Sequence, residues 1–271
     1  MTARPSSIAA ACRAVLLAAD PAAKVKTARA VARAWRRGAL AHDFDLALPD
    51  RPARPARPEL LPPNRMPKRG KAGSERSRIA LIHALAHIEF GAIDLAFDMA
   101  GRFGADLPRA FVDDWIGVGA DEAIHFALLD RRLRALGSAY GALPAHDGLW
   151  EAAAETAHDL LARLAVVPMV LEARGLDVTP ATVAAFERAG DVRSAAILMR
   201  IYRDEIRHVA AGTHWFRFAC ESGGFAPIPH WHFLVKAHFR GIVKPPFNDS
   251  ARDEAGLSRE YYAGVDASGF R

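Results

Sequence analysis

Cysteine is scarce in this chain, and its scarcity excludes one class of fold. The two cysteines, Cys12 and Cys220, lie far apart in the sequence and form no Cys-x-x-Cys pair. A disulfide framework, or a metal site built from clustered thiolates, needs more cysteines at closer spacing. We therefore expect two ordinary, partly buried thiols and a reducing compartment.

Long apolar runs and an export signal are missing as well. No uninterrupted apolar run approaches the roughly 20 residues that cross a bilayer. Arg13 interrupts the short apolar stretch from Ile8 to Ala19, so the N-terminal residues do not fit the pattern of a signal peptide. We expect a cytoplasmic protein with no membrane partner.

Acidic residues are few in the N-terminal part, which is therefore basic. The chain carries a formal net charge of +5. Much of the excess falls on Arg29, Arg33, Arg36, Arg37, Arg51, Arg54, Arg57, Arg65, Lys68, Arg69, Lys71, Arg76 and Arg78. Such a segment favours nucleic acid or another polyanion as a partner. The alternative is that these side chains confer solubility and pair with acids of the main domain, and the sequence leaves both open.

Proline is concentrated in one segment and divides the chain. Seven prolines fall between Pro49 and Pro67, a density that no helix or central strand tolerates. We expect an extended arm there. The predicted parts are a helical element (1–48), the arm (49–73), a four-helix bundle (74–222) and a C-terminal extension that covers the bundle (223–271).

Helical periodicity and capping residues predict an all-α fold. Asp20-Pro21 is a helix start and Gly38 a helix end. Pro168 falls inside the third long helix, where it should kink the backbone. The expected helices span residues 7–19, 21–37, 74–100, 108–136, 149–174, 179–189 and 191–220.

One motif, Asp-Glu-x-x-His, occurs twice in this chain. The copies are Asp121-Glu122-Ala123-Ile124-His125 and Asp204-Glu205-Ile206-Arg207-His208. A lone glutamate precedes each motif glutamate by 33 residues, Glu89 in the first half and Glu172 in the second. The two halves are offset by 83 residues throughout. This regularity predicts a duplicated helical hairpin.

The repeated residues predict a metal centre. On a helix, residues i and i+3 share a face, so each Glu-x-x-His directs one oxygen and one nitrogen ligand the same way. Four carboxylates and two imidazoles form the ligand set of di-iron and di-manganese four-helix bundles. The predicted ligands are Glu89, Glu122, His125, Glu172, Glu205 and His208. The alternative is that the four acids are buried and pair with arginines.

Other residues are weaker candidates for this centre. Asp121 and Asp204 precede the motif glutamates, and we expect each to accept the second N–H of a ligand histidine. Tyr202 lies one turn before Glu205, whereas its counterpart in the first half is Gly119. A phenol on one side and a gap on the other would form a lopsided substrate pocket, although a tyrosine that merely fills the core is equally compatible.

These motifs resemble a bacterial ferritin-like family of unknown function. The resemblance covers about residues 75 to 262 and rests on the paired motifs, on the Glu172-Ala173-Arg174-Gly175-Leu176-Asp177-Val178-Thr179-Pro180 string and on Pro245-Pro246-Phe247-Asn248. Wider relatives include the non-haem di-iron tRNA hydroxylase, ribonucleotide reductase small subunits, rubrerythrins and ferritins. The resemblance implies a ferritin-like bundle with a dinuclear site, and it implies no substrate.

The favoured hypothesis is an oxidoreductase in which two iron or manganese ions activate dioxygen. It would oxidise or hydroxylate an unidentified substrate, with a tRNA or a small molecule both open, and an electron-donating reductase would serve it. The alternatives are a ferroxidase or other iron-handling protein, and a bundle that the metal only holds together. The proline arm and long tail argue against a storage cage, so we expect a monomer or small homo-oligomer. The chain lacks the four-cysteine site of a usual rubrerythrin.

Overall fold

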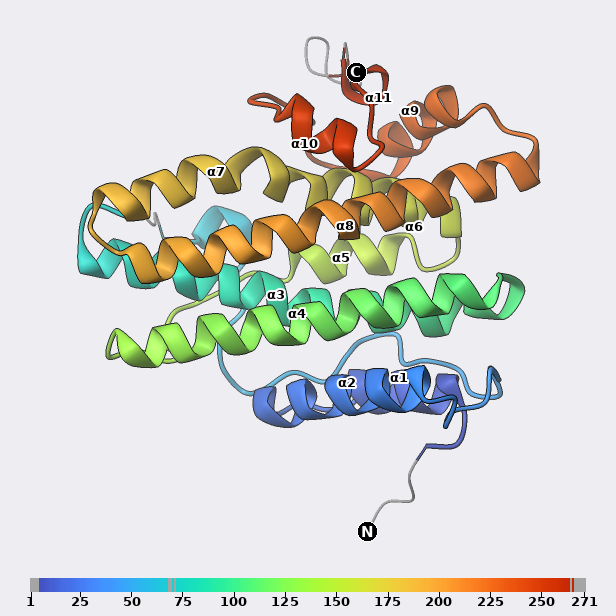
Figure 1. Ribbon diagram of the computed structural model, residues 1–271, viewed down its shortest axis with the longest axis horizontal. Coiled ribbons are helices and arrows are strands. Elements are labelled where there is room, and N and C mark those ends of the chain that lie inside the picture. Colours follow the sequence, from blue (N-terminus) through green and yellow to red (C-terminus); the bar gives the residue numbers. More distant parts are fainter. Residues whose placement is uncertain (1–4, 68–69, 71, 264, 266–271) are drawn as a thin grey trace. The chain divides into compact units, whose positions relative to one another are not determined.

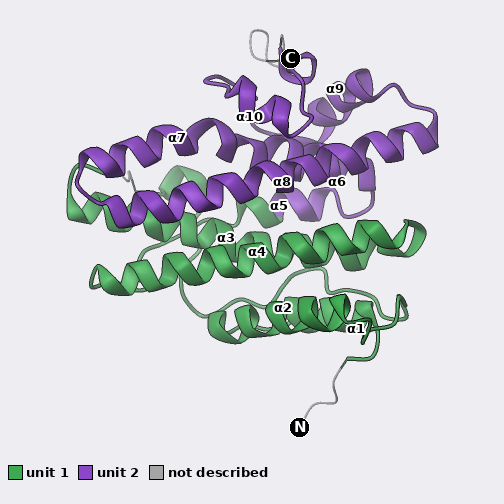
Figure 2. Cartoon of the chain, in the orientation of Figure 1, with its two compact units in different colours: residues 1–150 green, residues 151–271 purple. Residues whose placement is uncertain are grey.

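The computed structural model describes residues 5–67, 70, 72–263 and 265, and among them it contains helices and no β-strand (Figure 1). The all-α class expected from the sequence is confirmed. The chain divides into two compact units, residues 1–150 and residues 151–271 (Figure 2). The two units are described in turn.

Two helices form the N-terminal element of the first unit. α1 spans Ile8–Leu16, and α2 spans Pro21–Arg36. The Asp20 side chain caps α2 by accepting a hydrogen bond of 2.7 Å from the amide of Ala23, and Gly38 follows the helix with a φ of +67°. The sequence predicts α2 from these two residues, because aspartate is favoured at helix N-caps and glycine just after helix ends.

The proline-rich arm runs extended and is fastened by polar contacts. Among the described residues of the arm, a 3-10 turn, Pro63–Arg65, is the one regular element. Arg54 of the arm and the fully buried Lys24 of α2 both bind the carboxylate of Asp94. The backbone of Leu61 donates to the carbonyl of Ala145 at 2.8 Å. The basic residues Lys68, Arg69 and Lys71 lie outside the described residues.

A long helical hairpin forms the main body of the first unit. α3 spans Glu75–Phe103 and begins with a reciprocal Ser74–Ser77 cap. A short 3-10 turn, Gly104–Asp106, leads to α4, which spans Arg109–Ala135. α1 packs on α3, and α2 packs on α4. Every residue from 91 to 100 is buried, which places the core of the unit along this part of α3.

One helix bears on the expectation that no apolar segment spans a membrane. Glu75–Asp106 is long and apolar enough to cross a bilayer by length and composition, although 61% of the apolar window is buried inside the protein. The buried carboxylates of Asp94 and Asp98 within α3 pair with arginine or lysine. A core helix passes the same test, so the composition of α3 is weak evidence for a membrane span.

The helix predicted over residues 149–174 is interrupted in the structure, and its last segment continues beyond residue 174. α5 spans Gly148–Glu155, and α6 spans Leu160–Val166 after the cap of Asp159. A wide π-helical turn, Val167–Glu172, follows, and α7 continues from it over Ala173–Arg188. The predicted distortion at Pro168 is present as this π-helical turn. The predicted stop at Gly175 and the separate helix from residue 179 are wrong.

Pro180 is tolerated inside α7 because a side chain replaces the hydrogen bond that it removes. A proline at this position cannot donate to the carbonyl of Leu176, four residues earlier. The side-chain amide of Asn248 donates to that carbonyl instead, at 3.1 Å. Asn248 lies far along the chain, so the sequence near Pro180 does not reveal this compensation.

α8 spans Val192–Gly223 and packs against α7 and the π-helical turn. The Asp191 side chain caps it by accepting from the amide of Ser194 at 3.0 Å, and Gly224 ends it with a φ of +73°. A Cβ atom added at Gly212 would lie 2.4 Å from Cβ of Pro168. The absence of a side chain at Gly212 is therefore what allows α8 to approach the π-helical turn.

The C-terminal segment contains α9 (Pro227–His238), α10 (Asp249–Glu254) and α11 (Arg259–Tyr262). It is attached to α7 by polar contacts. Arg174 donates to the carbonyls of Lys244 and Pro246, both at 2.9 Å. Arg252 forms a bidentate pair with the buried carboxylate of Asp177, at 2.8 and 2.7 Å. The segment around Pro-Pro-Phe-Asn thus lies on α7, immediately after Glu172.

Candidate metal centre

Three of the predicted ligands converge in the first unit. Glu89 is on α3, and Glu122 and His125 are on α4. Each offers a ligand atom that lies within 4.8 Å of the other two. Nδ1 of His125 is 3.0 Å from Oε2 of Glu89 and 3.4 Å from Oε2 of Glu122. The three side chains therefore form a group that could hold a metal ion, here called the first half-site.

The first half-site is buried, which is unusual for two carboxylates. Glu89 is 4% exposed, Glu122 1% and His125 fully buried. Phe90 and Phe126, which follow Glu89 and His125 in the chain, are buried and pack with their ring centroids 5.3 Å apart. Burial of carboxylates among apolar groups costs free energy unless a cation or hydrogen-bond donor compensates. This donor set, two carboxylates and an imidazole, fits iron or manganese.

The electrostatics of His125 fit the same conclusion. Burial alone lowers the pKa of the imidazole, but its hydrogen bonds to Glu122 and Glu89 outweigh burial and raise the pKa to about 11. The proton on His125 thus offsets one of the two carboxylate charges of the half-site. A metal ion bound among the same atoms competes with that proton, so metal binding would release it.

The second unit holds the corresponding residues. Glu172 is the last residue of the π-helical turn, and Glu205 and His208 are one turn apart on α8. Nδ1 of His208 is 3.5 Å from Oε1 of Glu205. His208 is buried, whereas the Glu205 side chain is 13% exposed. These three residues, here called the second half-site, are less enclosed than the first half-site.

The two motif aspartates, Asp121 and Asp204, are both partly exposed. Asp204 accepts a hydrogen bond of 2.5 Å from Arg207, and Arg200 lies 3.8 Å from its other carboxylate oxygen. Asp121 is half-buried. Their expected role as acceptors for the ligand histidines stays a prediction.

The space expected beside Gly119 is filled, and Tyr202 has a hydrogen-bond partner. The space beside Gly119 is filled, because a Cβ atom there would lie 2.5 Å from Cε2 of Phe97. The gap expected from comparing the two halves is thus occupied by an aromatic ring. The hydroxyl of Tyr202 accepts a hydrogen bond of 2.9 Å from Asn248. Tyr202 therefore connects α8, near the second half-site, to the C-terminal segment.

The two histidines of α3 outside the motif bind the loop after α4. Nε2 of His83 accepts from the amide of Gly141 at 2.9 Å. Nδ1 of His87 is 2.9 Å from the hydroxyl of Tyr140, and its Nε2 is 3.2 Å from the carbonyl of His146. Burial, helped by Arg54, lowers the pKa of His87 to about 4. These histidines are structural contacts of the loop.

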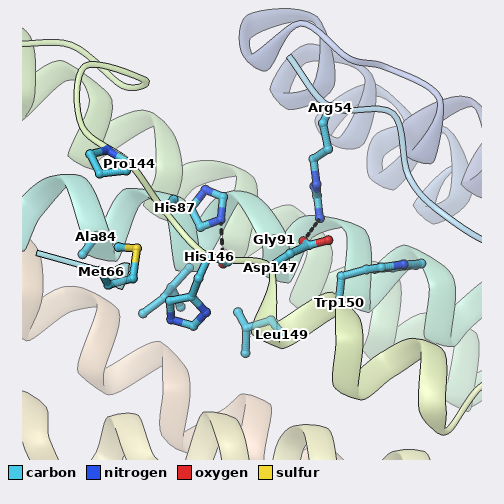
Figure 3. Close-up of a pocket in the computed structure, with 12 residues that line it drawn as sticks. Arg54, Met66, Ala84, His87, Gly91, Pro144, His146, Asp147, Leu149 and Trp150 are labelled. Carbon is cyan, nitrogen blue, oxygen red and sulfur yellow. Dashed lines mark hydrogen bonds and ion pairs between the residues drawn. The ribbon is translucent and has the colours of Figure 1, made fainter. Parts of the chain in front are cut away.

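A small hollow of about 40 Å³ lies beside His87 (Figure 3). The close-up shows His87 directed at His146, and Arg54 directed at Asp147, 3.7 Å away. Gly91 and Trp150 also line the hollow. Sequence reasoning missed this group, since it forms only when the proline arm and the 137–147 loop meet α3.

The buried aspartates of α3 were also missed. Asp94 and Asp98 are fully buried, and Asp98 binds Arg102 at 2.8 Å. Like Glu89, both are acidic residues inside the apolar, buried part of α3. The alternative to metal binding was that buried acids pair with arginines. Asp94 and Asp98 do pair with arginines.

The remaining candidates behave as ordinary residues. Glu155, part of an isolated Glu-x-x-His, pairs with Arg240, and its His158 packs against the ring of His238 at 5.9 Å. Cys12 and Cys220 are both free and buried. Burial raises the pKa of each thiol, that of Cys220 to about 11, so neither is a reactive thiolate.

Comparison with known proteins identifies the family of the chain. Residues 17–263 match the model of a family described as a protein of unknown function (DUF455). The chain belongs to this family. An uncharacterized protein of Haemophilus influenzae is 41% identical to the DUF455 chain over 211 residues, which cover 76% of this chain and 73% of that protein. No solved structure matches the chain.

Proposed function

We propose that this DUF455 chain is a non-haem di-metal carboxylate oxidoreductase. The first half-site is the observation that carries the proposal, because two carboxylates and an imidazole converge there in a buried setting. The second half-site repeats the same residue types at the same spacing. A stable fold does not need the same group of acids and imidazole twice. Two metal ions in a four-helix bundle do need four carboxylates and two imidazoles.

We propose Glu89, Glu122, His125, Glu172, Glu205 and His208 as the ligands of two ions, iron or manganese. His125 and His208 would supply imidazole nitrogens to these ions, and the four glutamates would supply carboxylate oxygens. Oxygen and nitrogen donors without thiolates suit these metals better than copper(I) or an iron–sulfur cluster. The absence of a Cys pair near any of the six residues agrees with this donor set. The same proposal includes a relationship to ferritin-like proteins, which we infer from the sequence motifs.

When bound in reduced form, such a pair of ions would supply the electrons that activate dioxygen. The residues of the chain contribute position, charge and exclusion of water. Phe90, Phe97 and Phe126 belong to the buried apolar core of the same unit. Glu122 and Glu89 hold the His125 imidazole in place through its Nδ1. Ligands with fixed rotamers keep the donor geometry constant between turnovers.

The substrate would enter from the second half-site. Its carboxylate Glu205 is partly exposed, in contrast to the first half-site. The π-helical turn ends at Glu172, and π-helical turns occur frequently at functional sites. Tyr202, held by Asn248, lies one turn from Glu205 and is a candidate to contact substrate. The substrate classes of this proposal are a tRNA and a small molecule.

Two other functions are tested together with this one. An iron-handling protein would oxidise ferrous iron and store it, and a structural protein would bind metal without turnover. The anaerobically reduced, metal-loaded protein should consume dioxygen and return to its starting optical spectrum on re-reduction. Continued iron uptake in air with growth of a mineral core, seen by light scattering, would favour iron handling. A bound metal that never reacts with dioxygen would favour the structural function.

A further inference from the structure

The outer face of α2 carries a stripe of exposed cations. The stripe consists of Lys26, Arg29, Arg33, Arg36 and Arg37. Spacings of three and four residues place these side chains on one side of the helix. α2 contains no acidic residue, and the acid just before it, Asp20, caps the helix. None of the five forms an ion pair in the described part of the chain, in contrast to Lys24 on the opposite face.

The apolar face of α2 is already used inside the first unit. Ala28, Val31, Ala32 and Trp35 are buried there, and α2 packs on α1 and α4. A helix that binds a membrane surface needs an apolar face free to enter the lipid. Because the apolar face of α2 is buried, any partner of its outer face would be bound through charge.

A hollow continues the stripe at the C-terminal end of α2. Its volume is about 410 Å³, and Arg36 and Arg109 line it together with Trp35 and Asp113. The guanidinium of Arg109 lies over the Trp35 ring, 3.8 Å from its centroid. Asp113 accepts a hydrogen bond of 2.7 Å from Nε1 of Trp35 and lies 3.9 Å from Nε of Arg109. These contacts hold the half-exposed Arg109 at the edge of the hollow.

The dimensions of the stripe match a nucleic-acid strand. Lys26 and Arg37 are eleven residues apart, which corresponds to about 16 Å along a helix. One strand of a duplex carries a phosphate every 3.4 Å or so of its axis, so about five phosphates face that length. Arginine, which makes up four of the five stripe residues, presents a planar fork that matches phosphate oxygens.

We infer that the outer face of α2 binds the phosphate backbone of a nucleic acid, with one phosphate seated between Arg36 and Arg109. The contacts are to phosphate and carry no base sequence. None of the stripe residues is a candidate metal ligand, so the inference does not rest on the proposed metal centre.

Binding of a short fluorescent single-stranded RNA, and of a duplex DNA of equal length, to the full chain tests the inference by anisotropy. Five phosphate contacts predict a slope of about −3.5 in log K against log salt for the single strand, a loss of about 100-fold between 50 and 200 mM salt. The Arg29→Glu, Arg33→Glu, Arg36→Glu variant should bind about 100-fold more weakly and show a slope of about −1.4. Comparison of the two probes shows which form of nucleic acid is preferred.

A matched variant controls for net charge. Arg131, Arg193 and Arg217 are exposed on other helices, and their joint replacement by glutamate changes the net charge equally. This control should keep its affinity within about threefold, and circular dichroism should show both variants folded. Absence of binding at low salt, or an equal loss in the control, would overturn the inference. Equally tight binding to phosphatidylglycerol vesicles, lost in the same α2 variant, would overturn it in favour of a lipid partner.

Discussion

Replacement of Asp94 by alanine should strongly destabilise the first unit. Asp94 is fully buried and binds two cations, Lys24 and Arg54. Without it, the buried ammonium of Lys24 keeps only the carbonyls of Val15 and Leu16, at 3.0 and 3.4 Å. A buried charge left without its counter-ion costs about 3–5 kcal/mol. Arg54 contributes less to this loss, because it is 19% exposed and has Asp147 nearby.

A double replacement distinguishes the lost ion pair from a general packing defect. The Lys24→Met, Asp94→Leu variant removes both buried charges and keeps the volume similar, a change that is often neutral. It should therefore be more stable than Asp94→Ala by about 2 kcal/mol or more.

Urea unfolding followed by circular dichroism measures both effects. Asp130→Ala is the matched control, because Asp130 pairs with Arg134 at the surface and its loss should cost at most about 1 kcal/mol. A loss below about 1 kcal/mol for Asp94→Ala would refute the reasoning. A double variant as unstable as the single variant would refute it too.

Three further results are expected. Gly212→Ala should cost about 1–3 kcal/mol in unfolding free energy, because its Cβ would meet Pro168 at 2.4 Å; a neutral result would mean that α8 shifts freely. Asn248→Ala should cost about 2–4 kcal/mol, since it uncovers the Leu176 carbonyl and removes the α10 cap; the same denaturation assay would show an unchanged midpoint if these bonds were dispensable. Asp121→Asn and Asp204→Asn should each weaken metal affinity by about 10- to 100-fold; equal affinity by competition with a chelator would make them ordinary surface acids.

The long helices could be predicted because their signals are local. Asp20 with Pro21, Ser74 and Asp191 all cap helices where the sequence places them. The convergence of Glu89 with Glu122 and His125 could be predicted as well. The helices depend on local periodicity, and the convergence depends on one hairpin, α3–α4. Neither depends on contacts with segments far along the chain.

The predictions that were wrong, or missing, concern contacts between distant residues. α7 continues through Pro180 because Asn248, far along the chain, binds the carbonyl that proline leaves open. Lys24 looks like a surface residue by its type, yet it is buried against Asp94. The room expected at Gly119 is filled by Phe97 from the neighbouring helix. Each outcome depends on a tertiary partner that no local pattern specifies.

Metal analysis of purified variants tests the central claim most directly. Iron and manganese would be measured in the wild-type chain, in the Glu122→Ala, Glu205→Ala double variant and in Glu155→Ala. The last is the matched control, since Glu155 belongs to a Glu-x-x-His that pairs with Arg240 at the surface. We expect about two ions per chain in the wild type and control, and almost none in the double variant, with helix content largely kept. Full metal content in the double variant, or no bound metal in the wild type, would contradict the account.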